Sequence, residues 1–237
     1  MITFNNATKQ FGDKTVLDNI SFSVAGNSSF ITILGKSGCG KTTLIRLLAG
    51  LEKLQSGDIF INEEKVTGGD RIIIPPHLRN IGIIFQDLAL FPHFTTFENI
   101  AFGLRLKKVN NYKKIVSDVL NQFNIFSLKD NFPNQLSGGQ QQLVALARSL
   151  VLNPEILLMD EPLANLDVKL KAQIRNLLKQ IVRERNITVI YVTHDHKEAM
   201  ELSDKILLLD GGKIEFLGTP HEMQQSNNNF VKEFIEL

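Results

Sequence analysis

The residues at positions 35–42, GKSGCGKT, have the types and the spacing of a phosphate-binding loop. They match G-x-x-x-x-G-K-[ST], with a short apolar run (30–34) before them and an apolar helical pattern (42–49) after them. Glycines let backbone N–H groups turn toward phosphate oxygens, and the N-terminus of the following helix adds positive potential. The residues predicted to bind nucleotide phosphates are Gly35, Lys36, Ser37, Gly38, Cys39, Gly40, Lys41, Thr42 and Thr43.

Two side chains of this loop have specific predicted roles. Lys41 can reach the β and γ phosphates of ATP, and the Thr42 hydroxyl can ligate Mg²⁺. The alternative is a plain glycine turn between a strand and a helix. Four constrained positions and both flanking elements favour the phosphate site. We therefore expect ATP and Mg²⁺ as the bound groups.

Two consecutive carboxylates, Asp160 and Glu161, follow a second buried apolar run at 156–159. Asp160 is predicted to hold Mg²⁺ through its water shell, and Glu161 to orient or deprotonate the attacking water. A strand that merely ends in an acidic turn is the alternative. The presence of a phosphate-binding loop in the same chain favours the interpretation of Asp160 and Glu161 as functional residues.

The rest of the pattern describes the elements that position these residues. Apolar runs typical of buried strands in a parallel sheet lie at 30–34, 81–85, 156–159 and 188–192. Helical spacing predicts amphipathic helices at 112–123 and 170–182. Alternation by two at 16–24 and 57–66 predicts antiparallel strands at one side, and Asp210-Gly211 predicts a hairpin turn. The expected fold is α/β: a mostly parallel RecA-like core with an antiparallel part and an inserted helical subdomain (about 87–150), in a single domain, 1–237.

Composition limits the partners and the location of the chain. The formal net charge is +1, from 26 Lys and Arg against 25 Asp and Glu, which gives no electrostatic case for nucleic acid or an anionic membrane. The single cysteine, Cys39, excludes an internal disulfide and favours a reducing compartment. Because no apolar run reaches the length of a spanning helix, any membrane role must come through a partner.

The segment 136–140 reads LSGGQ and resembles the signature of ABC ATPases. Ser137, Gly138 and Gly139 offer hydroxyl and backbone donors at a helix N-terminus, which makes a second anion site. The resemblance implies a head-to-tail dimer, in which this signature, including Gln140, closes on ATP held by the phosphate-binding loop of a second copy.

Further motifs follow the order of that family. The resemblance implies that Phe11 stacks on adenine and that Gln86 senses Mg²⁺ and the water and links to a membrane partner. It also implies that the segment 163–167, ending at Asp167, lies at the dimer seam and that His194 hydrogen-bonds the γ-phosphate. Plain core packing for Phe11 and a structural role for His194 are the alternatives. Two positions depart from the family pattern: Leu143 replaces a usual arginine, and Ala164 a common serine.

The segments 75–82 and 87–104 resemble the importer group for sugars, polyamines, ferric iron, thiamine and oxyanions. That implies a groove receiving a short helix from each permease subunit; Phe91, Phe94, Phe97 and Phe102 line the groove or form the core of the subdomain. Many relatives continue after a segment like 230–235 into a C-terminal regulatory domain. The sequence stops after that segment, so inhibition through such a domain is not expected unless another chain provides it.

These features together predict an ATP-hydrolysing subunit of a membrane importer of a small solute. We expect a homodimer on two permease subunits, indirectly served by a solute-binding protein, and peripheral on the cytoplasmic side of the inner or plasma membrane. Iron, polyamine, thiamine and oxyanion remain open as solute classes. The alternative is an ABC module that drives a non-transport membrane complex of the assembly or division type.

Overall fold

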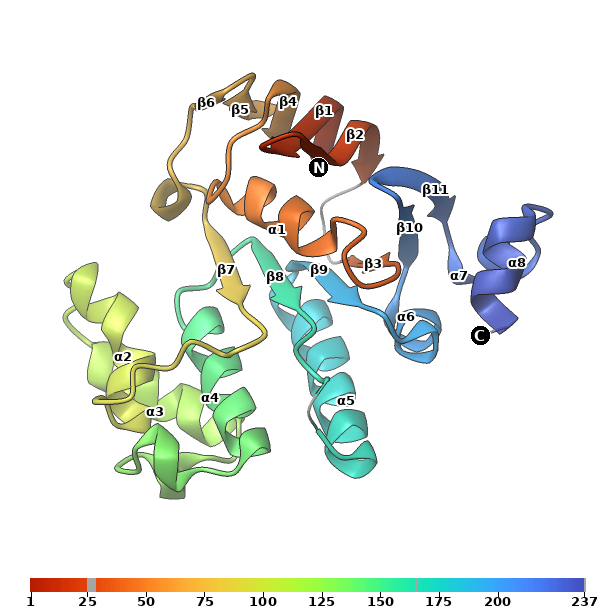
Figure 1. The fold of residues 1–237 in the computed structure, drawn as a ribbon. Coiled ribbons are helices and arrows are strands. Elements are labelled where there is room, and N and C mark those ends of the chain that lie inside the picture. Colours follow the sequence, from red (N-terminus) through yellow and green to blue (C-terminus); the bar gives the residue numbers. More distant parts are fainter. Residues whose placement is uncertain (25–28, 165, 237) are drawn as a thin grey trace.

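The computed structural model describes residues 1–24, 29–164 and 166–236, and its strands form two sheets (Figure 1). The first sheet is antiparallel, with the order β2-β1-β4-β5-β6. Its strands are β1 (Ile2–Phe11), β2 (Lys14–Val24), β4 (Ser56–Ile61), β5 (Glu64–Gly68) and β6 (Arg71–Ile72). The second has the order β11-β10-β3-β9-β8-β7. Its strands are β3 (Phe30–Leu34), β7 (Ile81–Ile84), β8 (Ile156–Asp160), β9 (Thr188–Thr193), β10 (Lys205–Asp210) and β11 (Lys213–Gly218).

The second sheet confirms the predicted parallel core. Every pairing from β10 to β7 is parallel, and only the β10–β11 hairpin is antiparallel. All residues of β3, β8 and β9 are buried, as expected for strands covered on both faces. Because the three strands are parallel neighbours, the residues that follow their carboxyl ends meet at one edge of the sheet.

Helices cover the two faces of this core differently (Figure 1). The helices are α1 (Lys41–Ala49), α2 (Thr96–Leu106), α3 (Tyr112–Gln122), α4 (Gly138–Leu150), α5 (Val168–Arg185), α6 (His196–Leu202), α7 (Pro220–Gln224) and α8 (Asn229–Glu236). Short 3-10 turns lie at Pro76–Leu78, Phe126–Leu128 and Pro133–Gln135. Helix α1 lies between the two sheets and shares a hydrophobic cluster with both, whereas α5 packs on the opposite face of the parallel sheet. The helices α6 and α7 were not predicted.

The helical subdomain is built by α2, α3 and α4, between β7 and β8 in the sequence. Its centre is apolar, with Ile100, Val116 and Val144 all fully buried. Helix α2 begins with a capping box in which Thr95 and Glu98 satisfy each other's backbone N–H groups. The segment folds as its own small helical layer beside the sheet edge at β7.

One predicted strand segment and one predicted turn differ in detail from the structure. The alternating stretch 57–66 is a hairpin of β4 and β5, because Asn62 and Glu63 take left-handed φ angles of 49° and 67°. The predicted turn at Asp210-Gly211 lies one residue later: Gly211 and Gly212 have φ of 50° and 79°, and Asp210 still pairs with Lys213. Two consecutive left-handed residues suit the twist of a two-residue hairpin.

Arg79 joins α1 to the antiparallel sheet. Its side chain is buried, and no carboxylate forms an ion pair with it among the described residues. Its guanidinium donates hydrogen bonds of 2.8 to 3.2 Å to the carbonyls of Leu47, Leu48, Val66 and Ile74 and to the hydroxyl of Thr67. Burial lowers the pKa of Arg79 to about 10, so the group stays charged at neutral pH. The sequence contained no signal for this role.

Replacing Arg79 by Met is expected to lower the free energy of unfolding by about 3 kcal/mol or more, because several buried carbonyls lose their donors. Urea denaturation measures this loss. Arg71→Met is the control, since Arg71 is exposed on the short edge strand β6 and is expected to change stability by about 0.5 kcal/mol at most. Equal denaturation midpoints for the two variants would contradict the structural role of Arg79.

Candidate nucleotide site

The phosphate-binding loop runs from β3 into α1. Gly40 has φ of 112°, and a Cβ on it would lie 2.7 Å from a methyl carbon of Leu17, so both conformation and packing require glycine there. The ammonium of Lys41, 5% exposed, donates to the carbonyls of Gly35 (2.8 Å) and Lys36 (3.0 Å). The positive charge therefore lies within the curve of the loop, where phosphate oxygens are expected.

A hollow of about 180 Å³ opens on this loop. Its lining comprises Val16, Ser37, Gly38, Gly40, Lys41, Thr42, Thr43 and Glu161. The loop and the carboxylate of Glu161, which lie more than a hundred positions apart in the chain, thus share one cavity. The cavity belongs to the edge where β3, β8 and β9 end.

Asp160 ends β8 beside the loop. Its Oδ1 accepts a hydrogen bond from the hydroxyl of Thr42 at 3.2 Å, so two of the three residues predicted for the Mg²⁺ site are adjacent. Burial raises the pKa of Asp160 above its usual range; the nearby Glu161 raises it further, and the Thr42 hydroxyl opposes the shift. Desolvation thus makes the charged carboxylate unfavourable in the nucleotide-free protein.

Glu161 and His194 lie next to each other. A carboxylate oxygen of Glu161 is 3.4 Å from Nδ1 of His194, which directly follows β9. Glu161 has a left-handed φ of 44°, and its N–H donates to the carbonyl of Val192 at 3.0 Å. This conformation is costly for a residue with a side chain, and such residues often occur at functional sites.

Gln86 lies in a second hollow, of about 240 Å³, that also reaches Glu161. Its lining includes Gln86, Gly138 and Leu166, from three segments far apart in the sequence. Gln86 is exposed just after β7. The glutamine predicted to sense the metal and the water is therefore on the same side of the site as Glu161.

The signature segment forms the N-terminus of α4. Ser137 and Gln140 form a capping box, in which each side chain accepts from the other's backbone N–H. Gly139 is buried against Leu170 of α5, and a Cβ there would overlap that side chain. Ser137 and Gly138 are exposed, and no signature residue is in the lining of the hollow on the chain's own phosphate-binding loop.

The other predicted site residues lie at element ends. Phe11 is the last residue of β1 and is 47% exposed, with the Lys9 ammonium 4.4 Å from its ring centroid, so it is not part of the core. Asp167 caps α5 by accepting from the N–H of Leu170 at 3.0 Å. Asn165, between Ala164 and Asp167 in the expected dimer seam, lies outside the described residues.

The aromatic residues after Gln86 divide into two groups. Phe91, Phe94 and Phe102 form a triad with ring centroids 4.8 to 5.9 Å apart, and Phe91 is 38% exposed. Phe97 packs against the subdomain core. The subdomain core therefore accounts for Phe97, while the triad leaves the Phe91 ring partly exposed.

Arg148 of α4 was missed by the sequence reasoning. Its guanidinium donates to the carbonyls of Leu88 (2.7 Å) and Ala89 (2.6 Å), which both have left-handed φ angles. Burial lowers the pKa of Arg148. Arg148 thereby fixes the turn after Gln86 to the signature helix. A lone arginine in an otherwise apolar helical pattern was the only available signal. Leu143, one turn earlier, packs against the subdomain core.

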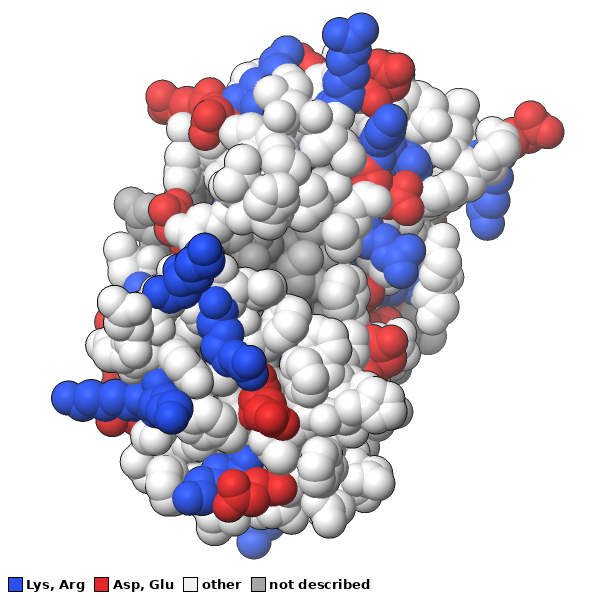
Figure 2. Space-filling view, turned by 90° about the vertical axis from the view of Figure 1, so that its left-hand side faces the viewer, with Lys and Arg blue, Asp and Glu red and all other residues white. Residues whose placement is uncertain are grey.

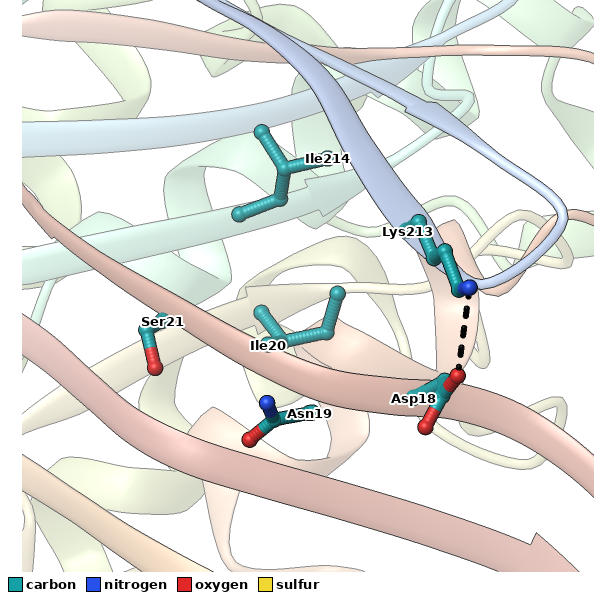
Figure 3. A pocket seen from close by; sticks show the side chains of 6 residues that line it. All are labelled: Asp18, Asn19, Ile20, Ser21, Lys213 and Ile214. Carbon is teal, nitrogen blue, oxygen red and sulfur yellow. Dashed lines mark ion pairs between the residues drawn. The ribbon is translucent and has the colours of Figure 1, made fainter.

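A third hollow, of about 440 Å³, has no residue of the phosphate-binding loop in its lining (Figure 3). It separates β2 from β11 and is lined by Asp18, Asn19, Ile20, Ser21, Lys213 and Ile214. Its charged groups are an exposed ion pair, with the Lys213 ammonium 3.5 Å from the Asp18 carboxylate. None of the predicted site residues lines it, so we interpret it as a joint between the two sheets.

Asp160→Asn is expected to stabilise the nucleotide-free protein at pH 7, because it removes a charge that burial disfavours. A raised pKa means that the folded state binds the proton more tightly than the unfolded state. The wild type should therefore gain stability as pH falls through the folded pKa, and the difference between the two proteins should shrink. Urea denaturation at several pH values checks this; an Asn variant less stable at pH 7 would contradict it.

The fold and the site define a P-loop nucleotide-binding protein. The ABC transporter family model matches residues 17–164, and the chain belongs to that family. It is 44% identical over 237 residues to an Fe(3+) ions import ATP-binding protein, FbpC, of Fusobacterium nucleatum. It is 46% identical over 239 residues to a spermidine/putrescine import ATP-binding protein, PotA, of Pasteurella multocida. Each alignment covers 99% of this chain but only 62% and 63% of the two relatives.

A solved relative has the same fold. The dimeric, post-hydrolysis structure of the ATP-binding cassette MJ0796 bound to ADP and Pi superposes with a TM-score of 0.80 at 32% identity, covering 93% of this chain and 99% of that one. The predicted α/β fold is thereby confirmed. Among the described helices, none has the length and apolarity that crossing a membrane requires.

Proposed function

We propose that this chain hydrolyses ATP as the energising subunit of an ABC-type membrane importer of a small solute. The observation that carries the proposal is the convergence of Lys41, the Thr42–Asp160 pair and the Glu161–His194 pair at one edge of the parallel sheet. The relatives named as import ATP-binding proteins for ferric iron and for spermidine/putrescine support import over a non-transport role.

The residues at the loop fit Mg²⁺. The Thr42 hydroxyl and the Asp160 carboxylate are adjacent hard oxygen donors, and Gln86 adds an amide oxygen on the Glu161 side. Mg²⁺ commonly keeps waters and phosphate oxygens as ligands, so one hydroxyl, one carboxylate and one amide oxygen from the protein suit it. When bound, Mg²⁺ neutralises charge on the β and γ phosphates.

The protein side chains perform the remaining steps. Lys41 and the loop N–H groups bind the phosphates and orient the γ-phosphate. Glu161 orients the attacking water and accepts its proton, since its carboxylate faces the cavity of the loop. His194 hydrogen-bonds the γ-phosphate while it stays in contact with Glu161. Phe11 offers an exposed ring on which adenine stacks.

The signature supports a dimer. Its exposed Ser137 and Gly138 are at a helix N-terminus and outside the chain's own phosphate-binding cavity. We propose that they contact ATP bound by a second copy in a head-to-tail dimer, as a dimeric ADP-bound relative suggests. Asp167 then lies at the seam between the copies.

The further partners are two permease subunits and, indirectly, a solute-binding protein, with the chain peripheral on the cytoplasmic side of the membrane. Two features support a docking role for the helical subdomain. One is the triad of Phe91, Phe94 and Phe102, in which Phe91 is partly exposed. The other is a group of basic side chains on the outer face of α2 and α3 (Figure 2). The exposed basic residues there are Arg105, Lys107, Lys108, Lys113 and Lys114. The solute class remains iron, polyamine, thiamine or oxyanion.

An affinity pull-down tests the proposal. Tagged Glu161→Gln chain is incubated with ATP and detergent-solubilised membranes, and its partners are identified by mass spectrometry. A multi-span permease recovered in equal amount is the expected result. Tagged Lys41→Ala chain is the control that lacks tight ATP binding and should recover less permease. Recovery of only soluble or single-span proteins would overturn the importer assignment.

A further inference from the structure

A buried polar network lies directly behind the Glu161–His194 pair, and its centre is Glu198 of α6. This carboxylate is 4% exposed. It accepts hydrogen bonds from the hydroxyls of Tyr191 (2.8 Å) and Thr193 (3.1 Å), and the ammonium of Lys171 lies 3.3 Å from its other oxygen. Burial raises the pKa of Tyr191, so its phenol remains a donor. A buried carboxylate requires such partners, because desolvation disfavours its charge.

The network fixes both neighbours of His194. Thr193 donates its hydroxyl proton to Glu198, and its oxygen accepts from the N–H of Asp195 at 3.0 Å. The carboxylate of Asp195 then accepts from the N–H groups of Lys197 and Glu198 at the start of α6. The turn that carries His194 is therefore held on one side by the Glu198 side chain, through Thr193, and on the other by the backbone at the start of α6, through Asp195.

Lys171 connects this turn to the segment that precedes α5. Its N–H donates to the carbonyl of Asp167 in the first turn of that helix. A narrow cavity of about 50 Å³ joins the two regions, lined by Glu161, Ala164, Lys171, Thr193, His194, Asp195 and Glu198. A cation in the first turn of a helix opposes the helix dipole, so Lys171 is stabilised there by its buried partner rather than by its own helix.

We propose that Lys171 and Glu198 are positioning residues, which hold His194 against Glu161 and link its position to Ala164 and Asp167. The inference rests on the proposed function, because the reaction that this geometry serves is ATP hydrolysis. Without the Lys171 ammonium, Glu198 would be a buried carboxylate lacking its cation. The turn would then shift toward solvent and move His194 away from Glu161. Displacements of about 1 Å at a reacting centre can lower rates by roughly 100-fold.

The same two helices offer a matched control. Arg175 of α5 lies 3.1 Å from Glu201 of α6, one helical turn beyond the Lys171–Glu198 pair on both helices. Neither Arg175 nor Glu201 lines the cavity behind His194. Arg175→Gln therefore removes an ion pair between the same elements and leaves the hydrogen bonds around His194 in place.

The first test is steady-state ATP hydrolysis by the purified chain. Lys171→Met is expected to lower kcat about tenfold, with KM for ATP within about twofold, in a chain that is less stable but still folded at the assay temperature. Lys171→Arg should restore most of kcat, and Arg175→Gln should stay within about twofold of the wild type. Glu198→Gln, whose amide oxygen can still accept from both Tyr191 and Thr193, should match Lys171→Met, and the double variant should be no slower than either single one.

A second measurement does not need hydrolysis. The imidazole C–H signal of His194 in NMR spectra of the nucleotide-free chain is expected to shift and broaden in Lys171→Met but not in Arg175→Gln. If the wild type lacked ATPase activity, the proposed function would fail while this measurement still tested the positioning. An unchanged His194 signal in Lys171→Met, or an equal loss of kcat in Arg175→Gln, would overturn the inference.

Discussion

Replacing Glu161 by Gln is expected to lower the rate of ATP hydrolysis by about 100-fold or more, while ATP binding is retained. The side chain faces the cavity of the phosphate-binding loop and lies 3.4 Å from His194. Gln has the same size but cannot accept the proton of the attacking water. The contacts of Lys41 with the loop are unaffected, so nucleotide should still bind and the ATP-bound dimer should accumulate.

Phosphate release measures the rate of hydrolysis, and size-exclusion chromatography with ATP measures the accumulation of the dimer. Glu155→Gln is the matched control, because Glu155 precedes the opposite end of β8, where its carboxylate accepts from the side chains of Asn62 and Asn80. That variant should hydrolyse ATP like the wild type. Near-normal hydrolysis by Glu161→Gln would contradict the proposed role of Glu161 in catalysis.

The second large effect is expected for Lys41→Ala, which should weaken ATP binding by roughly 10- to 100-fold. The ammonium is buried and already faces two loop carbonyls, at 2.8 and 3.0 Å. Charged hydrogen bonds of this kind contribute about 1.5–3 kcal/mol each, and alanine removes every one that Lys41 would make to the phosphates.

Isothermal titration calorimetry with ATP and Mg²⁺ gives the affinity directly. Lys36→Ala is the comparison within the same loop, since Lys36 is exposed and its ammonium lies 5.9 Å from the ring centroid of Phe230. It should lose far less affinity than Lys41→Ala. Unchanged affinity in Lys41→Ala would refute the assignment of the loop.

Much of the fold was predictable because its signals are local. The buried strands at 30–34, 156–159 and 188–192 were identified from continuous apolar runs, and each matches β3, β8 or β9 within a residue at either end. Helix α1 likewise ends at a local signal, Gly50, because glycine readily adopts the left-handed conformation that ends a helix; its φ is 75°. The family resemblance, now confirmed, rested on short motifs of the same local kind.

Other features depended on partners that no local pattern identifies. Arg79 binds carbonyls from α1 and β5, up to 32 positions away, and Arg148 binds carbonyls 59 and 60 positions away. The alternating pattern over 57–66 does not reveal the turn between β4 and β5. Asn62 and Glu63 form that turn, and neither is the Gly that usually marks one. Helix α6 was not predicted, because a helix of seven residues is too short to show a clear helical periodicity.

The phosphate-binding loop, the carboxylates after β8, the signature and the fold class could all be predicted from the amino-acid sequence, because each is encoded in residues adjacent along the chain. The three-dimensional arrangement was needed to show which of them share a cavity: the parallel order β3-β9-β8 brings Lys41, Glu161 and His194 to one edge, while the signature stays outside that cavity. It alone showed that Lys171 and Glu198 meet behind His194. Such pairings depend on crossovers between strands, whose geometry is set by packing of the whole core rather than by any single segment.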